Sequence, residues 1–190
     1  MYFQYLLKYM NGEEQKTNQG QAEQLDAVRD GFIAQWGAFG SQWGINRTMA
    51  QIHALLMTGI GAMSTDEVME KLGISRGNAH TNLKDLVGWG LVRIIVKKGE
   101  RKEFFEAEKD VWKIFTIILR ERQRREIDPA LELLRDCQEE TKGLKGAEAE
   151  AFRDQVKELE QFVGFARNIG GKVNKLSYGP AMKLAAKFLG

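Results

Sequence analysis

The sequence predicts a mainly α-helical fold with one small β-hairpin. Two prolines occur among 190 residues, and strand-like runs are few outside residues 91–107, so most of the chain favours helices. Residues 91–96 are apolar and β-branched, which favours a strand, and residues 103–107 offer a partner strand across a charged turn. Directly before this hairpin, residues 64–90 contain the caps and glycines of two short helices.

The two short helices form a helix-turn-helix motif. Ser64 can cap the first helix, and Glu67 completes a capping box three residues later. Gly73 ends this helix, because glycine adopts the left-handed C′ conformation without steric cost. Ser75 can then cap the second helix, which should end at residues 88–90.

The second helix has an apolar and a polar side, as the helical repeat predicts. The apolar side, which should pack on the preceding helix, comprises Ala79, Leu83, Leu86 and Val87. The polar side comprises Gly77, Asn78, Thr81 and Lys84. Arg76 lies at the edge of the apolar side, in the first turn. Polar side chains of these kinds can recognise base edges and bind phosphates.

Basic charge is concentrated in this helix and in the hairpin, which together form a winged helix-turn-helix. Residues 75–102 contain seven basic and two acidic residues, a net charge of +5, whereas the whole chain carries only +2. Such a concentration favours nucleic acid as the partner.

Three segments resemble the MarR-type winged-helix transcriptional regulators, specifically their GbsR-like branch. They are LGISRGNAHTNLKDLVGWGLV at residues 72–92, GERKEFFEAEKDVWKI at 99–114 and WGINRTMAQIHALL at 43–56. The resemblance covers about residues 25–140. It implies a dimeric DNA-binding regulator, most simply a repressor, whose occupancy of DNA responds to a signal. In the best-known members of the branch this signal is choline, an osmoprotectant precursor.

The expected DNA-binding residues lie on the second helix and on the hairpin. They are Ser75, Arg76, Asn78, Thr81, Lys84, Lys97, Lys98, Arg101 and Lys102. Asn78 and Thr81 would contact bases, and Arg76 a base or a phosphate. Arg101 would enter the minor groove, and the serine and lysines would bind the backbone. A homodimer would place two such helices on an inverted repeat of double-stranded DNA, with half-sites about 10 bp apart.

We expect three regions along the chain. Residues 1–20 form a lead whose polar part, 11–20, is a loop; residues 21–109 form the DNA-binding domain; residues 110–190 form a helical dimerisation region. The helix from about residue 21 should end near residues 40–44. Its apolar stripe suits core or dimer packing and consists of Leu25, Val28, Phe32, Trp36, Phe39 and Trp43. Asn46 should cap the next helix.

Three further helices are expected after the hairpin. One starts near Asp110, and Asp128-Pro129 should cap and begin the next. The third starts near residue 147 and should stop at Gly170-Gly171, before a last short helix at 180–189. Its apolar residues have coiled-coil spacing and are Phe152, Val156, Leu159, Val163 and Ala166.

An effector resembling choline would need a cage of aromatic faces around its quaternary ammonium. The candidates are Trp36, Trp43, Trp89, Phe104, Phe105 and Trp112. For most of them, packing in the core is the competing interpretation.

The sequence contains no motif of an enzyme, a cofactor site or a metal site. There is no phosphate loop or dinucleotide fingerprint, and neither His53 nor His80 has a neighbour at metal-ligand spacing. The single cysteine, Cys137, excludes an intramolecular disulfide and suits a reducing compartment. With no membrane-spanning run and no signal peptide, we expect a cytoplasmic protein. Two alternatives remain open: a winged-helix protein-interaction module, and an architectural DNA binder without sequence preference.

Overall fold

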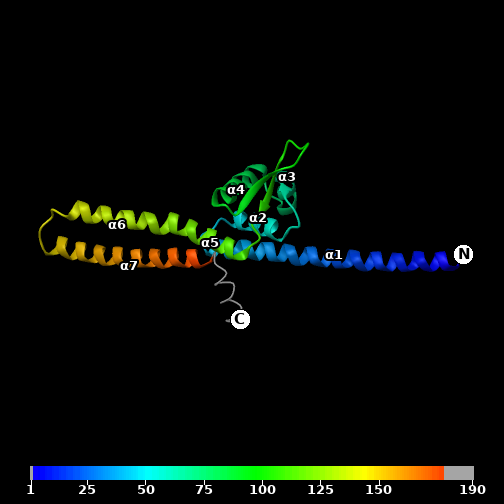
Figure 1. The fold of residues 1–190 in the computed structure, drawn as a ribbon, viewed down its shortest axis with the longest axis horizontal. Helices are drawn as coiled ribbons and strands as arrows, with labels where there is room; N and C mark the ends of the chain where they lie inside the picture. The colour runs from blue at the N-terminus through cyan, green and yellow to red at the C-terminus, as the bar shows by residue number, and fades with distance from the viewer. Residues whose placement is uncertain (1, 178–190) are drawn as a thin grey trace, which may run out of the picture. The chain divides into compact units, whose positions relative to one another are not determined.

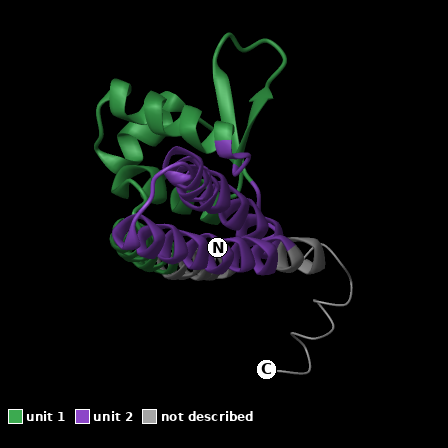
Figure 2. Ribbon diagram, turned by 90° about the vertical axis from the view of Figure 1, so that its left-hand side faces the viewer, with its two compact units in different colours: residues 1–88, 92–107 green, residues 89–91, 108–190 purple. Residues whose placement is uncertain are grey.

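The computed structural model describes residues 2–177, with side chains described for residues 19–171. Seven α-helices and three short strands follow one another along these residues, in two compact units (Figures 1 and 2). The first unit comprises residues 1–88 and 92–107, and the second comprises residues 89–91 and 108–190. The predicted helix at 180–189 lies outside the described residues.

Helix α1, Tyr2–Gln42, is longer than expected. The prediction of a loop at residues 11–20 is wrong, because the helix passes through them without interruption. Residues 13–24 are rich in Glu, Gln, Lys and Ala, which are good helix formers, and no proline interrupts them. The end of the helix is where glycines were expected to place it, since Gly44 adopts a positive φ of 73°.

Helix α1 packs against α2, Arg47–Thr58, through a different side from the one predicted. Ile33 is buried there, and Gly37 and Gly40 bring the two backbones close: a Cβ atom added at Gly40 would lie 2.5 Å from Ala50 Cβ. The predicted aromatic stripe is exposed instead, with Trp43 67% and Val28 65% exposed. Packing of this stripe in the core of its own unit is therefore wrong.

Helix α2 and the sheet form the core of the first unit. Asn46 Oδ1 caps α2 as predicted by accepting from Met49 N–H at 3.1 Å, and Ile52 and Leu56 are fully buried. The strands β1 (Met63–Ser64), β2 (Val92–Val96) and β3 (Glu103–Ala107) form an antiparallel sheet in the order β1-β3-β2. Strand β1 was not predicted, because a two-residue strand leaves no alternation to detect.

The second unit begins with α5, Val111–Arg122, which Asp110 caps as predicted through a 3.0 Å bond from Trp112 N–H. A π-helical segment, Gln123–Ile127, joins it to α6, Asp128–Thr141. The predicted cap at Asp128 is wrong, since this residue already has helical torsions. Its carboxylate instead forms an ion pair with Arg167 at 2.8 Å.

Helix α7, Ala147–Ser177, packs antiparallel to α6 and does not stop at Gly170-Gly171 as predicted. Only part of the predicted seam faces α6: Val156 is buried, whereas Phe152 and Leu159 are exposed. The exposed residues continue as a second apolar stripe along α7. This stripe consists of Phe152, Leu159, Phe162, Phe165 and Ile169.

Candidate nucleic-acid interface

The local sequence determines how helix α3, Thr65–Leu72, and helix α4, Arg76–Trp89, are joined. The capping box is present as predicted: Glu67 N–H donates to Ser64 Oγ at 3.3 Å, and Ser64 N–H donates to Glu67 Oε2 at 2.6 Å. These bonds from the Ser64 backbone and side chain hold the pKa of Glu67 below its usual value. Gly73 closes α3 with φ 62°, and Ser75 Oγ accepts from Asn78 N–H at the start of α4.

Helix α4 has the two sides that the helical repeat predicts. Ala79, Leu83 and Leu86 are buried, and Val87 is half-buried. The opposite side is exposed and consists of Gly77, Asn78, Thr81 and Lys84. A Cβ atom added at Gly77 would meet nothing within 4 Å, so this part of α4 is open. The polar side is therefore accessible to a partner.

Asn78, the predicted base-contacting residue, has an oriented side chain. Its Oδ1 accepts from Asn82 Nδ2 at 2.7 Å, and its Nδ2 donates to Thr48 Oγ1 at 3.5 Å. Each bond uses one of two hydrogen-bonding positions of the atom, so one acceptor and one donor position remain. That pair is what the major-groove edge of adenine requires. Sequence analysis missed Asn82, which is buried; its spacing of four from Asn78 was the available indication.

The hairpin of β2 and β3 extends from the same unit as α4 (Figure 1). Gly99 allows its tight turn with φ 89°, and Glu100 N–H donates to Lys97 O at 3.1 Å. Arg93 and Glu106 face each other across the strands and form an ion pair at 2.6 Å. The hairpin is thus braced at its base by a cross-strand pair and is basic at its tip.

The predicted hairpin cations differ in what holds them. Lys98 and Arg101 are exposed and form no ion pair within the described part of the chain. Lys97 Nζ lies 3.7 Å from the centroid of the Phe104 ring, a cation–π contact. Lys102 Nζ donates to Asp66 Oδ2 at 2.8 Å.

Asp66, in the first turn of α3, is a second residue that sequence analysis missed. Its Oδ1 pairs with Arg76, and its Oδ2 with Lys102. The hydrogen bond from Lys102 and the charge of Arg76 hold the pKa of Asp66 below its usual value, and the same bond raises the pKa of Lys102. The partners are ten and 36 residues away in sequence, so no local pattern indicates these pairs.

The six aromatic candidates for an effector site do not share one environment. Trp36 packs on Phe32, with ring centroids 5.5 Å apart. Cations of the chain already cover two of the rings, since Lys97 lies over Phe104, and Arg125 lies 4.9 Å from the centroid of Trp89. Phe105 is buried in β3, whereas Trp43 is exposed and Trp112 half-buried. The aromatic cage stays a prediction.

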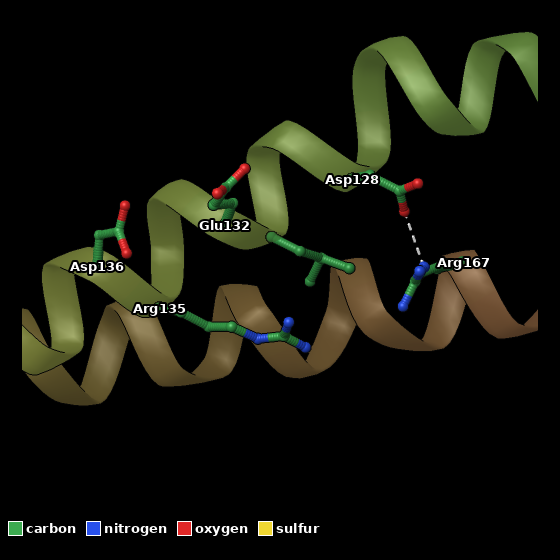
Figure 3. Close-up of a pocket in the computed structure, with 6 residues that line it drawn as sticks. Asp128, Glu132, Arg135, Asp136 and Arg167 are labelled. Atoms are coloured by element: carbon green, nitrogen blue, oxygen red, sulfur yellow. Dashed lines mark ion pairs between the residues drawn. The ribbon is translucent and has the colours of Figure 1, made fainter.

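A pocket of about 350 Å³ between α6 and α7 contains none of these aromatic residues (Figure 3). Its two cations are paired, Arg167 with Asp128 and Arg135 with Glu160, each at 2.8 Å. Glu132 and Asp136 point away from α7. The pocket offers no unpaired cation to an anionic ligand.

Two searches of the described residues found nothing. No three His, Cys, Asp or Glu side chains come together there in an arrangement that could hold a metal ion. No helix in that part of the chain is long and apolar enough to cross a membrane.

Comparison with known proteins identifies the fold. Residues 43–102, from the end of α1 to the hairpin, match the MarR family. A solved structure described as a transcriptional regulator aligns with a TM-score of 0.65 and 17% identity, covering 78% of this chain and 96% of that one. No curated protein matches the sequence. The mainly helical fold with a small antiparallel sheet is thus a MarR-type winged helix, as predicted; the GbsR-like branch stays a prediction.

Proposed function

We propose that this chain, whose winged-helix region is MarR-like, is a sequence-specific DNA-binding transcriptional regulator. One observation carries the proposal: Asn78 is exposed on α4 and oriented by Asn82 and Thr48, with one donor and one acceptor position left for a base. A protein-interaction module would not need an amide held in this way next to a basic hairpin. The match of residues 43–102 to the MarR family supports the same conclusion.

The regulator acts as a homodimer. Each unit of the chain carries an exposed apolar stripe on a long helix, which a monomer would leave in contact with water. The stripe on α1 includes Leu25, Val28, Phe32, Trp36 and Phe39, and that on α7 runs from Phe152 to Ile169. Covering them with a second copy produces a two-fold assembly, so the operator is an inverted repeat with half-sites about 10 bp apart.

Repression is the simplest consequence of occupancy, because a bound dimer excludes other proteins from the same DNA. The protein acts in the cytoplasm, where that DNA is. A small cationic effector, choline-like by resemblance, would release it by favouring a dimer whose helix spacing does not fit the operator.

A gel-shift assay tests the proposal. Wild-type protein is titrated on its own upstream DNA and on random DNA of equal length, at about 150 mM salt. We expect preferential binding to the upstream DNA. Asn78→Ala/Thr81→Ala should abolish the preference, because these residues contact bases. Arg101→Ala should weaken binding to both DNAs and flatten the salt slope by about one unit, since it removes one backbone contact.

Two results would contradict the proposal. Equal weak binding to both DNAs, unaffected by Asn78→Ala/Thr81→Ala, would indicate an architectural DNA binder. No binding to either DNA, even at low salt, would place the winged helix among protein-interaction modules.

A further inference from the structure

One carboxylate joins the predicted recognition helix to the hairpin. Asp66 on α3 binds Arg76, the first residue of α4, with one oxygen, and Lys102, the residue before β3, with the other. All three residues belong to the same compact unit, in which α3, α4 and the hairpin lie together (Figure 1). Both cations are among the expected DNA contacts, and both are largely exposed, 69% and 61% respectively.

The carboxylate is held in place by the start of its own helix. Asp66 follows the Ser64 cap by two residues, where the amino end of α3 favours a negative charge. The Ser64–Glu67 capping box fixes the backbone of this turn. Asp66 is therefore a negative charge at a defined position in a surface that is otherwise basic.

A carboxylate and a phosphate bind the same donors with similar geometry. While Arg76 and Lys102 are paired with Asp66, neither can pair fully with DNA. Ion pairs between exposed side chains are weak, so a well-placed phosphate can replace the carboxylate. Asp66 thus competes with DNA inside the protein itself.

We infer that Asp66 is a specificity-determining residue that keeps Arg76 and Lys102 off random DNA and releases them on the operator. This inference rests on the proposed function. On random DNA the complex is held by backbone contacts alone, and the two cations stay with Asp66. On the operator, base contacts by Asn78 and Thr81 hold α4 close to the groove, and the backbone phosphates take both cations. Asp66 therefore lowers the affinity for random DNA more than the affinity for the operator.

The test measures Asp66→Asn on two duplexes of about 30 bp at several salt concentrations. One duplex has a random sequence, and the other is recovered by the wild-type protein from a randomised pool. The variant should bind random DNA about fivefold to tenfold more tightly, the range that two exposed ion pairs allow. Its salt slope on random DNA should steepen by about two units, one for each released cation. Its affinity for the recovered duplex should change less than twofold, so discrimination falls.

Asp85→Asn is the matched control, because Asp85 is exposed on α4 and forms no ion pair within the described residues. It removes the same charge but releases no cation, so discrimination should stay at the wild-type value. A fall equal to that of Asp66→Asn would show a general charge effect and overturn the inference. Equal changes on both duplexes, or weaker binding to both with Asp66→Asn, would also overturn it.

A second variant leaves Asp66 and the capping box intact, so it serves even if Asp66→Asn folds poorly. Arg76→Ala/Lys102→Ala should bind random DNA with wild-type affinity and slope but bind the recovered duplex more weakly. Weaker binding to random DNA would overturn the inference, because the two cations would then already contact DNA there. A wild-type protein that binds neither duplex would instead overturn the proposed function.

Discussion

His53 is buried in α2 among apolar neighbours. It is 4% exposed, and within the described structure its Nε2 atom has no hydrogen-bond partner. Burial lowers its pKa to about 4, because the charged imidazolium would lose its hydration. The folded chain therefore keeps His53 neutral at pH values where the unfolded chain protonates it.

This difference predicts a loss of stability in acid that belongs to one residue. As pH falls from about 6.5 to 4, the unfolded state takes up a proton that folded His53 does not, and the free energy of unfolding falls by about 3 kcal/mol. His53→Leu, of similar volume, should be at least as stable as wild type at pH 7 and should lack this part of the pH dependence. Urea denaturation of both proteins at pH 7, 5.5 and 4.5 measures the difference. Parallel stability curves for the two proteins would contradict the prediction.

Other single residues could be assigned from the sequence because their partners are local. Ser64, Glu67 and Gly73 act within one or two turns of the helix they bound, and their spacing alone indicates the capping box and the turn. Asp66 lies among them and could not be assigned, since its partners come from α4 and the hairpin. Sequence spacing predicts short-range hydrogen bonds, whereas ion pairs between elements depend on the fold.

At the scale of elements, glycines decide how α1 meets α2. Sequence analysis treated Gly37 and Gly40 as residues that weaken a helix, yet the helix continues to Gln42. A Cβ atom at Gly37 would meet the movable Gln51 side chain, whereas one at Gly40 would meet Ala50 Cβ, which cannot move without the backbone of α2. Close helix packing thus outweighs the helix propensity that glycine lacks.

Gly40→Ala should therefore destabilise the protein by about 1–3 kcal/mol, the usual cost of overpacking. The matched control is Gly31→Ala in the same helix, where an added Cβ meets nothing within 4 Å. That change should stabilise by up to about 1 kcal/mol, because alanine is the better helix former. Urea denaturation followed by circular dichroism measures both variants. A Gly40→Ala variant as stable as Gly31→Ala would show that the close contact between α1 and α2 has no energetic consequence.

At the scale of the whole molecule, the exposed stripes on α1 and α7 predict a dimer. Wild-type protein should sediment at twice the chain mass of 21.6 kDa at micromolar concentration. Val28→Glu on α1 and Phe162→Glu on α7 should each shift it toward monomer, since a buried unpaired carboxylate is costly. Asn168→Glu is the control, because Asn168 is exposed and lies about 120° around α7 from Phe162. A wild-type monomer, or equal effects of all three variants, would contradict the dimer.

The sequence by itself determined the elements of the winged helix. Caps, glycine turns and the two-sided pattern of α4 predicted residues 64–107 closely, because each depends on neighbours a few positions away. The same patterns predicted which side of α4 is buried and which side is exposed. Helix ends without such punctuation were predicted poorly, as in the lead before residue 21 and at Gly170-Gly171.

Only the tertiary structure decided which apolar sides are buried and which charges are paired. The stripe on α1 is strongly apolar, yet the helix packs through Ile33 and two glycines and leaves the stripe exposed. The basic surface expected from residues 75–102 contains an acidic centre, because Asp66 reaches it from outside that segment. Hydrophobic and charge patterns state what a residue can bind, but burial and pairing depend on which elements the fold brings into contact.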